Sequence, residues 1–465
     1  LVFEELLAHH LSLRQLRWRR QRDSAPPLGG DGALGQRFRS GLPFRLTGAQ
    51  QRVIDEIDAD LGQPRPMLRL VQGDVGSGKT VVAAWAVLRA VEAGWQAAVM
   101  APTELLSEQH YRNFHAWLAP LGVAVTWLTG RLGKREREAA LGAIASGTAR
   151  VVVGTHALFQ AGVAFAGLGL MVVDEQHRFG VHQRLRLRDK GRSPHQLVMT
   201  ATPIPRTLAM SIYADLDTSV IDELPPGRTP VATVAVSEQR RAEVVERVRM
   251  ACRAGRQAYW VCPLIDESEV LECQAASELA RQLGEVLPEL RVGLVHGRLR
   301  AADKAAAMEA FQQGEIQLLV ATTVIEVGVD VPNASLMIID NAERLGLSQL
   351  HQLRGRVGRG ATASHCVLLY KPPLSAAARS RLGVLRDSHD GFAIARRDLE
   401  LRGPGEVLGT RQTGSLGMRI ADLIRDEDLL PAVQAEADGL LQEHPEAVRG
   451  LIRRWIGDGG RYGAV

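Results

Sequence analysis

The sequence contains few cysteines and no long apolar run. No apolar stretch reaches the roughly 18 to 20 residues that cross a bilayer, and the first residues lack the order of a signal peptide. These absences predict a soluble, cytoplasmic protein without a membrane partner. The four cysteines show no C-x-x-C spacing, so we expect buried or free thiols rather than a zinc site or disulfides: Cys252, Cys262, Cys273 and Cys366.

Lysine is scarce as well, and most of the positive charge comes from arginine. The net charge is +4 and the sequence pI is 9.0, although the chain has only five lysines. Arginine suits phosphate contacts because its planar guanidinium can donate two parallel hydrogen bonds. Coding bias produces the same enrichment, so charge alone supports nucleic-acid binding only weakly.

The length of 465 residues predicts two to four domains. The chain opens on Leu1 rather than Met, directly with an arginine-rich, amphipathic stretch over residues 1–22, and we interpret it as an excerpt of a longer protein. A stretch rich in proline and glycine follows as far as Gly35. Its many breakers predict a linker without regular structure.

Short aliphatic and β-branched runs then alternate with helical patterns in two sets. The first set lies near residues 67–73, 96–101, 123–128, 150–154, 168–173 and 196–199, and the second near 257–263, 291–296, 316–321, 335–339 and 365–370. Such alternation predicts buried parallel sheets wrapped by helices. The predicted fold class is therefore α/β, with two tandem doubly wound parallel-sheet domains and a small, mainly helical C-terminal module. The expected boundaries are 1–40, 41–225, 226–375 and 376–465.

Residues 73–80 read GDVGSGKT between an apolar strand and a helical run, which is the pattern of a phosphate-binding loop. Its glycines let backbone N–H groups surround phosphate oxygens, and the helix N-terminus adds a positive dipole. We expect Lys79 to bind the β- and γ-phosphates of ATP and Thr80 to bind Mg²⁺. The rest of the loop completes the predicted nucleotide site: Gly73, Asp74, Val75, Gly76, Ser77 and Gly78.

An acidic pair follows the predicted strand at 168–173. Asp174 is expected to hold Mg²⁺, and Glu175 to orient and polarise the water that attacks the γ-phosphate. An acidic residue at a strand end is often only a helix cap. Together with the phosphate-binding loop, the pair predicts hydrolysis of ATP as well as binding.

The second predicted domain has no phosphate-binding loop but carries the arginine-rich string QLRGRVGRG at residues 352–360. At the start of a helix, Arg356 and Arg359 would lie on one face, at i and i+3. Both are candidates to reach a γ-phosphate presented by the first domain, which would make hydrolysis depend on domain closure. The alternative is a solvated basic helix or a contact with a phosphate backbone.

From residue 42 onward, the motifs resemble those of superfamily 2 helicases in their order. LTGAQ at 46–50 resembles the motif whose glutamine, here Gln50, recognises adenine, and DEQH at 174–177 is a variant of the D-E-x-H box. The resemblance implies two RecA-like domains and puts Asp330 near the ribose of ATP. It also implies residues that grip DNA or couple that grip to hydrolysis: Thr103, Thr155, His156, Thr200, Thr202, His296 and Thr322. Taken singly, each short threonine motif is better explained by local capping.

Longer strings resemble the RecG family most. DEQHRFGVHQ from residue 174, TATPIPRTLAM from 200 and HQLRGRVGRG from 351 are similar to RecG and to the transcription-repair coupling translocase, and DELPPGRTP from 222 favours RecG. Residues 397–414 resemble the element that, in both families, couples domain closure to movement on duplex DNA. On this resemblance we expect coupling roles for Arg402, Arg411 and Gln412.

The resemblance implies an ATP-dependent DNA helicase or translocase that uses ATP and Mg²⁺. Its expected substrates are forks and Holliday junctions, in fork regression, junction formation and branch migration during recombination and repair. It also implies a bacterial, cytoplasmic, nucleoid-associated monomer that works with single-strand-binding protein, and an upstream wedge domain that this chain lacks. The alternatives are an RNA helicase of the same fold, separable by whether RNA or branched DNA stimulates hydrolysis, and a non-catalytic nucleotide-gated scaffold, which Glu175, Arg356 and Arg359 argue against.

Overall fold

A computed structural model describes residues 1–21, 23–160, 162–175, 193–201, 216–225, 228, 230–263, 269–323, 331–360, 362–402, 418–423 and 425–457. The chain forms two compact units. The first comprises residues 1–73, 78–223 and 402–465, and the second residues 74–77 and 224–401. The expected domain boundaries stay predictions, and residues 376–465 contribute to both units.

The first unit is built on a seven-stranded parallel sheet in the order β3-β4-β2-β5-β6-β1-β7. Its strands are β1 (Leu68–Gly73), β2 (Gln96–Met100), β3 (Val125–Leu128), β4 (Val151–Gly154), β5 (Leu168–Asp174), β6 (His195–Thr200) and β7 (Asp217–Ile221). Along β5, Leu170 and Val172 pack into one core while Met171 and Val173 pack into another. Both faces are therefore buried, which explains the continuous apolar runs in the sequence.

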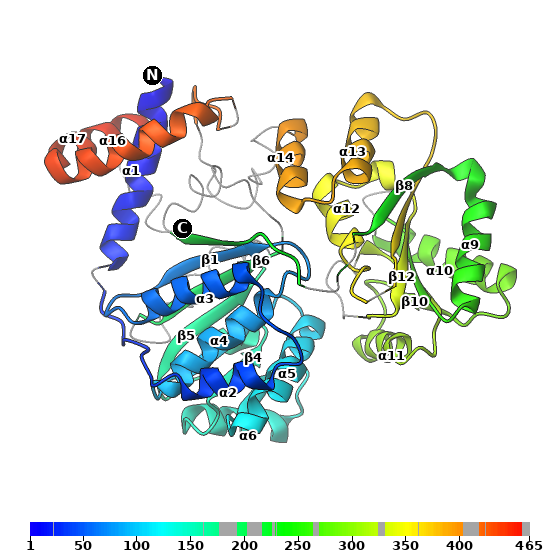
Figure 1. The fold of residues 1–465 in the computed structure, drawn as a ribbon, viewed down its shortest axis with the longest axis horizontal. Coiled ribbons are helices and arrows are strands. Elements are labelled where there is room, and N and C mark those ends of the chain that lie inside the picture. Colours follow the sequence, from blue (N-terminus) through cyan, green and yellow to red (C-terminus); the bar gives the residue numbers. More distant parts are fainter. Residues whose placement is uncertain are drawn as a thin grey trace. The chain divides into compact units, whose positions relative to one another are not determined.

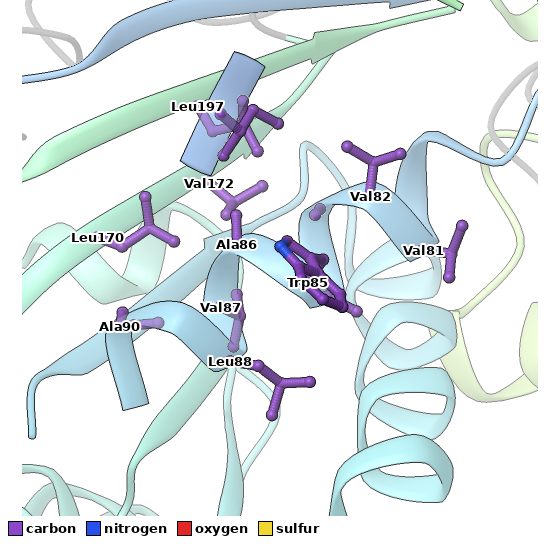
Figure 2. Packing of buried hydrophobic residues seen from close by; sticks show 14 of the residues in the cluster. Val81, Val82, Trp85, Ala86, Val87, Leu88, Ala90, Leu170, Val172 and Leu197 are labelled. Atoms are coloured by element: carbon purple, nitrogen blue, oxygen red, sulfur yellow. The ribbon is translucent and has the colours of Figure 1, made fainter. Parts of the chain in front are cut away.

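Helices cover both faces of this sheet: α3 (Gly48–Leu61), α4 (Lys79–Glu92), α5 (Glu104–Leu118) and α6 (Lys134–Ala145). The helix α4 is apolar almost all round, as expected for a helix enclosed by protein. Figure 2 shows its side chains beside Leu170, Val172 and Leu197 of the sheet. The helix that follows the phosphate-binding loop is thus anchored in the main core of the unit.

The second unit contains a six-stranded parallel sheet in the order β10-β11-β9-β12-β13-β8. Its strands are β8 (Ala232–Ser237), β9 (Gln257–Val261), β10 (Val292–Val295), β11 (Leu318–Ala321), β12 (Ala334–Ile339) and β13 (His365–Tyr370). The helices are α9 (Arg241–Arg253), α10 (Glu269–Val286), α11 (Ala301–Gln312), α12 (Leu347–Arg354), α13 (Ala376–Asp387) and α14 (Gly391–Arg402). The predicted α/β class with two parallel sheets is confirmed.

The two ends of the described chain meet in a helical cluster. The long helix α1 (Val2–Gln21) packs against α16 (Leu430–Glu443) and α17 (Pro445–Ile456), as Figure 1 shows. The Glu5 carboxylate accepts backbone N–H groups from Arg419, Ile420 and Ala421. Although burial alone would raise the pKa of Glu5, these three hydrogen bonds hold it below its usual range.

The structure corrects the predicted linker. A helix, α2 (Ala33–Gly41), begins within the stretch that was expected to lack regular structure. Gly35 lies so close to the Trp85 ring that a side chain there would collide with it. Packing against α4 therefore makes a glycine useful at this position and outweighs its low helix propensity. The strands β7 and β8 were also missing from the prediction.

The four cysteines are buried thiols that are not joined in disulfides, as expected. None of the helices that the structure describes has the length and apolar character needed to cross a bilayer.

Candidate nucleotide and nucleic-acid site

The parallel register of the first sheet brings the predicted catalytic residues to one edge. Thr200, which ends β6, is paired with Gln72 of β1, directly before Gly73. Asp174, which ends β5, is paired with Met199 of β6. The carboxyl ends of these three neighbouring strands thus carry the start of the phosphate-binding loop, the acidic pair and the threonine motif. This edge is where ligands bind in open α/β sheets.

The loop after β1 has the backbone of an anion cradle. Gly76 and Gly78 adopt φ values of 79° and 87°, which side chains other than glycine rarely adopt. The helix α4 begins at Lys79, and the residue before it provides no side-chain cap. The first-turn N–H groups can therefore donate to a phosphate. The Lys79 ammonium donates to the Gly73 carbonyl oxygen at 2.7 Å, which keeps it at the mouth of the loop.

Gln50 lies beside this loop. Its side-chain oxygen accepts from the backbone N–H of Thr47 at 2.9 Å, which completes a capping box at the start of α3. A side chain at position 78 would collide with the Gln50 amide. The predicted adenine-recognising residue and the loop are therefore close in space, although the loop starts 23 positions after Gln50 in the sequence.

The acidic pair has two distinct environments. Asp174 is buried, and its Oδ2 lies 2.8 Å from Nε2 of His110 on α5. Glu175 has a φ of 54°, a left-handed conformation that is uncommon outside glycine. Its carboxylate accepts from the Thr200 hydroxyl at 3.2 Å and from the Ala201 N–H at 2.8 Å. Backbone strain of this kind gathers at functional sites, where the surroundings hold the residue in place.

The donor set fits Mg²⁺ bound together with a nucleotide. Mg²⁺ binds few protein carboxylates and takes its remaining ligands from phosphate and water. Among the described residues, no cluster of three or more metal-binding side chains occurs. Asp174 at the strand end and Thr80 on the first turn of α4 are the predicted ligands on this edge.

The threonines expected to grip DNA have local roles in this structure. The Thr103 hydroxyl accepts from the Leu106 N–H at 3.3 Å and caps α5. The Thr155 hydroxyl caps the 3-10 helix His156–Phe159, with 3.5 Å to the Ala157 N–H. Capping thus occupies these hydroxyls, and contacts with DNA at these positions stay predictions.

Two candidates for DNA contact follow strands of the second sheet. Thr322 lies after β11 and is fully buried, and its hydroxyl has no hydrogen-bond partner within the described part of the chain. His296 lies after β10. Its pKa is lowered by burial, and the nearby charges of Lys304 and Arg298 lower it further. These basic neighbours suit a phosphate contact, because they keep positive charge close to the ring.

The arginine string departs from the helical prediction. The helix α12 ends at Arg354, and Arg356 and Arg359 lie beyond it. Gly358 has a φ of 80°, which an α-helix excludes. Arg359 folds back so that Nε donates to the Gly355 carbonyl oxygen at 3.3 Å. The expectation that both arginines share a helix face is therefore wrong, because the helix ends before Arg356 and Gly358 lies between the two arginines in a left-handed conformation.

Within the second unit, a hydrogen-bonded chain runs through α12. The Arg354 guanidinium donates to the carbonyl oxygens of Leu385 and Ser388 at 2.8 and 2.7 Å, and to Nδ1 of His351 at 3.1 Å. Because arginine only donates, His351 must carry its proton on Nε2, which lies 2.7 Å from Oδ1 of Asp74. Burial lowers the pKa of Arg354. No local sequence pattern predicts these hydrogen bonds, because the residues that form them are far apart in the sequence.

Arg228 is a further residue that the prediction missed. It donates to the carbonyl oxygens of Val75 and, at 3.2 Å, Gly358, both within the second unit. The string DELPPGRTP that contains it contributes only a family resemblance to the sequence analysis. Four predicted residues lie outside the described part of the chain, as does the side chain of Arg402 at the end of α14: Thr202, Asp330, Arg411 and Gln412.

Three protein families match the chain in sequence. The DEAD/DEAH box helicase family matches residues 47–211, and the helicase conserved C-terminal domain matches residues 241–361. Residues 388–451 match the family described as ATP-dependent DNA helicase RecG, domain 3, C-terminal. Most strands of each sheet thus lie within the match to a different helicase family: β1 to β6 of the first sheet and β9 to β12 of the second.

Curated relatives match nearly the whole chain. The ATP-dependent DNA helicase RecG of Escherichia coli K12 is 62% identical over 99% of this chain and 67% of its own length. That of Haemophilus influenzae is 61% identical over 98% and 66%, and that of Aquifex aeolicus 46% identical over 96% and 57%. The chain therefore spans about two thirds or less of the length of these relatives.

Solved structures match as well. A structure of RecG bound to a three-way DNA junction has a TM-score of 0.75 and 43% identity, over 92% of this chain and 56% of that one. Yeast Dbp5 bound to RNA and ADP BeF3 has a TM-score of 0.57 and 15% identity, over 87% of this chain and 98% of that one. At that identity, the second likeness shows the fold alone.

Proposed function

The chain belongs to the RecG family of ATP-dependent DNA helicases, and from this premise we propose that it couples ATP hydrolysis to movement on branched DNA. The proposed reactions are fork regression, Holliday junction formation and branch migration in recombination and repair. The support for branched DNA is the related RecG structure bound to a three-way junction. The relatives are longer than this chain, and the activity of a whole relative does not establish that this chain unwinds DNA. Unwinding by this chain is therefore part of the proposal.

One observation carries the proposal of hydrolysis. The phosphate-binding loop, Asp174 and the pair Glu175–Thr200 all lie at the carboxyl edge of one sheet. A phosphate-binding loop without acidic residues beside it would be sufficient for nucleotide binding but not for hydrolysis. The presence of a carboxylate on the strand end, with a second carboxylate held in place beside it, supports attack by water on the γ-phosphate.

The chain's own residues divide the chemistry among them. Lys79 and the N–H groups of the loop bind the phosphates, and Gln50 recognises adenine. Asp174 and Thr80 hold Mg²⁺, which when bound neutralises charge on the phosphate oxygens. Glu175 orients the attacking water, and Thr200 keeps the Glu175 carboxylate in position. Arg356 and Arg359 are proposed to stabilise the charge that develops on the γ-phosphate.

The proposed DNA contacts are mainly with the phosphate backbone. Such contacts carry no sequence information, so affinity should fall steeply with salt and vary little with sequence. The predicted contact and coupling residues were chosen by resemblance: Thr103, Thr155, His156, Thr200, Thr202, His296, Thr322, Arg402, Arg411 and Gln412. A monomer in the bacterial nucleoid that works with single-strand-binding protein completes the proposal.

The deciding experiment measures ATP turnover with four nucleic acids of equal length and concentration: a three-way junction, a linear duplex, a single strand and an RNA duplex. We expect the junction to stimulate turnover most. Equal stimulation by all DNA forms would reduce the proposal to a DNA translocase without junction preference. Stimulation by RNA alone would replace it with an RNA helicase. The same series on a full-length relative tests whether junction preference depends on the parts of the relatives that this chain does not cover.

A further inference from the structure

One buried contact of the acidic pair has no role in the proposed chemistry. His110 lies on α5, with 4% of its surface exposed, and its Nε2 is 2.8 Å from Oδ2 of Asp174. Asp174 is itself 8% exposed. A carboxylate can only accept, so this hydrogen bond places the ring proton on Nε2.

The ring makes no other hydrogen bond within the described residues. Its Nδ1 is buried and has no hydrogen-bond partner among them. On the same helix, the Phe114 ring packs edge-on against it at a centroid distance of 6.4 Å. An apolar side chain would fill this place without leaving a buried polar atom unpaired, and such an atom is costly. The position of His110 is therefore better explained by its contact with Asp174 than by packing.

The helix that carries His110 also begins at a proposed DNA contact. Thr103 caps α5, and His110 lies about two turns further along the same rigid helix. Ser107 of this helix accepts from the Trp127 indole N–H at 2.8 Å, and Phe114 is fully buried in the core. One stiff element thus joins the predicted DNA-gripping motif to the predicted metal ligand.

We propose that His110 is a positioning residue for Asp174 and that it links α5 to the binding of Mg²⁺ and nucleotide. This inference rests on the proposed function, which makes Asp174 a metal ligand. By donating to one oxygen of the carboxylate, His110 fixes the orientation of the side chain and leaves the other oxygen available. Partners of this kind orient metal ligands, and their loss typically costs about 10- to 100-fold in metal affinity.

The test follows the Mg²⁺ dependence of fluorescent ADP binding, a measurement that needs no turnover. In His110→Leu the donor is lost, and we expect the Mg²⁺ concentration for half-maximal ADP binding to rise on the order of 10-fold. His110→Gln retains an N–H donor near the Nε2 position and should stay within about 3-fold of the unaltered chain. His110→Asn is polar but too short, so it should resemble His110→Leu and serves if the leucine variant fails to fold.

Phe114→Leu is the matched control, because it disturbs the packing of the same helix without removing the donor. It should lower the melting temperature and leave the Mg²⁺ midpoint unchanged. An unchanged midpoint in both His110→Leu and His110→Asn would overturn the proposal. An equal shift in His110→Gln and Phe114→Leu would also overturn it, since the effect would then come from packing.

The link to DNA is tested by repeating the titration with a three-way junction. Junction DNA should change the Mg²⁺ concentration for half-maximal ADP binding in both chains. The change should be several-fold larger in the unaltered chain than in His110→Leu. Equal shifts in both would remove the link through α5. Turnover of the unaltered chain with and without the junction is recorded in parallel. If DNA does not stimulate turnover, the proposed function fails, whereas the shift in His110→Leu without DNA still decides the positioning role.

Discussion

The two sheets of this protein have the same strand order but different chemistry. Strands β1 to β6 of the first sheet have the same spatial order as strands β8 to β13 of the second. The first sheet has one additional strand, β7, at its edge. Only the first carries a glycine-rich loop after its initial strand. A shared topology therefore does not give a shared function, because the function resides in the loops at the carboxyl edge.

The strand-end aspartates show the difference most clearly. Asp174 ends β5, and Asp340 directly follows β12, the strand in the equivalent position. Asp174 contacts His110, and no arginine or lysine forms an ion pair with it within the described residues. Asp340 receives two hydrogen bonds from Arg241, at 3.0 and 2.5 Å, and a third from the Trp260 indole at 3.0 Å. The Arg241 guanidinium already neutralises the charge of Asp340, so this carboxylate is poorly suited to bind a metal ion.

The first helix of each sheet differs in the same way. Lys79 is the first residue of α4, and Arg241 is the first residue of α9. A glycine without a cap precedes Lys79, whereas the short helix Glu238–Arg240 precedes Arg241 and puts an acidic side chain near the helix start. An acidic side chain there interacts with the positive end of the helix dipole and would repel the negative charge of a phosphate. The comparison predicts one nucleotide site, on the first sheet.

The largest effect is expected for Lys79→Ala. Lys79 is proposed to bind the phosphates both in the ground state and during transfer, so turnover should fall by more than about 10³-fold, to the detection limit. The fold should be unaffected, because Lys79 contributes little to the core. Turnover with saturating junction DNA and the melting temperature are the measurements. Substantial remaining turnover would mean that the first sheet does not hold the site.

Arg359→Ala should reduce turnover by roughly 10³-fold while changing ATP affinity much less, because an arginine finger acts mainly on the transition state. Single-turnover hydrolysis and equilibrium nucleotide binding separate the two quantities. An unchanged turnover rate would remove Arg359 from this role. The same pair of measurements on Arg356→Ala shows whether the second unit contributes one arginine or two.

A smaller effect, on stability alone, is expected from the ion pair of the second sheet. Arg241→Met leaves the buried carboxylate of Asp340 unpaired and should cost about 3 kcal/mol of unfolding free energy. The double variant Arg241→Met with Asp340→Leu should recover part of this loss. Denaturant unfolding of both single variants and the double variant gives the coupling energy. A change in ATP affinity would contradict a purely structural pair.

The smallest effect concerns acid sensitivity, which should be concentrated in the first unit. Burial and, to a smaller extent, the charge of the nearby Arg14 lower the pKa of His10 to about 4, although Asp438 partly opposes them. The unfolded chain binds this proton near pH 6.5 and the folded chain only near pH 4, so stability falls as the pH drops between these values. At pH 5.5 the loss should be about 1 kcal/mol.

Hydrogen exchange at pH 7.5 and 5.5, corrected for intrinsic rates, checks this at α1. His10→Gln cannot titrate, so protection of α1 should depend less on pH in that variant. An identical pH dependence in both chains would exclude His10 as the source.

Much of the fold was predictable because the signals are local. Eleven strands were expected within two residues or so of their observed ends, since a buried parallel strand is a short apolar run with polar boundaries. The phosphate-binding loop was predictable for the same reason, as its glycines and Lys79 are consecutive. The sequence could not reveal that α12 ends at Arg354 or that α2 forms around Gly35, because glycine is compatible with either outcome and packing against Trp85 decides.

By itself, the sequence determined the parallel sheets, the glycine-rich loop after β1 and the acidic strand end, since each depends on neighbouring residues and on the alternation of apolar runs. Only the tertiary structure decided which distant side chains meet. It brought His110 to Asp174, and it paired Arg241 with Asp340 across 99 positions. Such contacts depend on how helices pack on a sheet, which no local pattern encodes. They determine at which of the two similar sheet edges an arginine pairs with the strand-end aspartate.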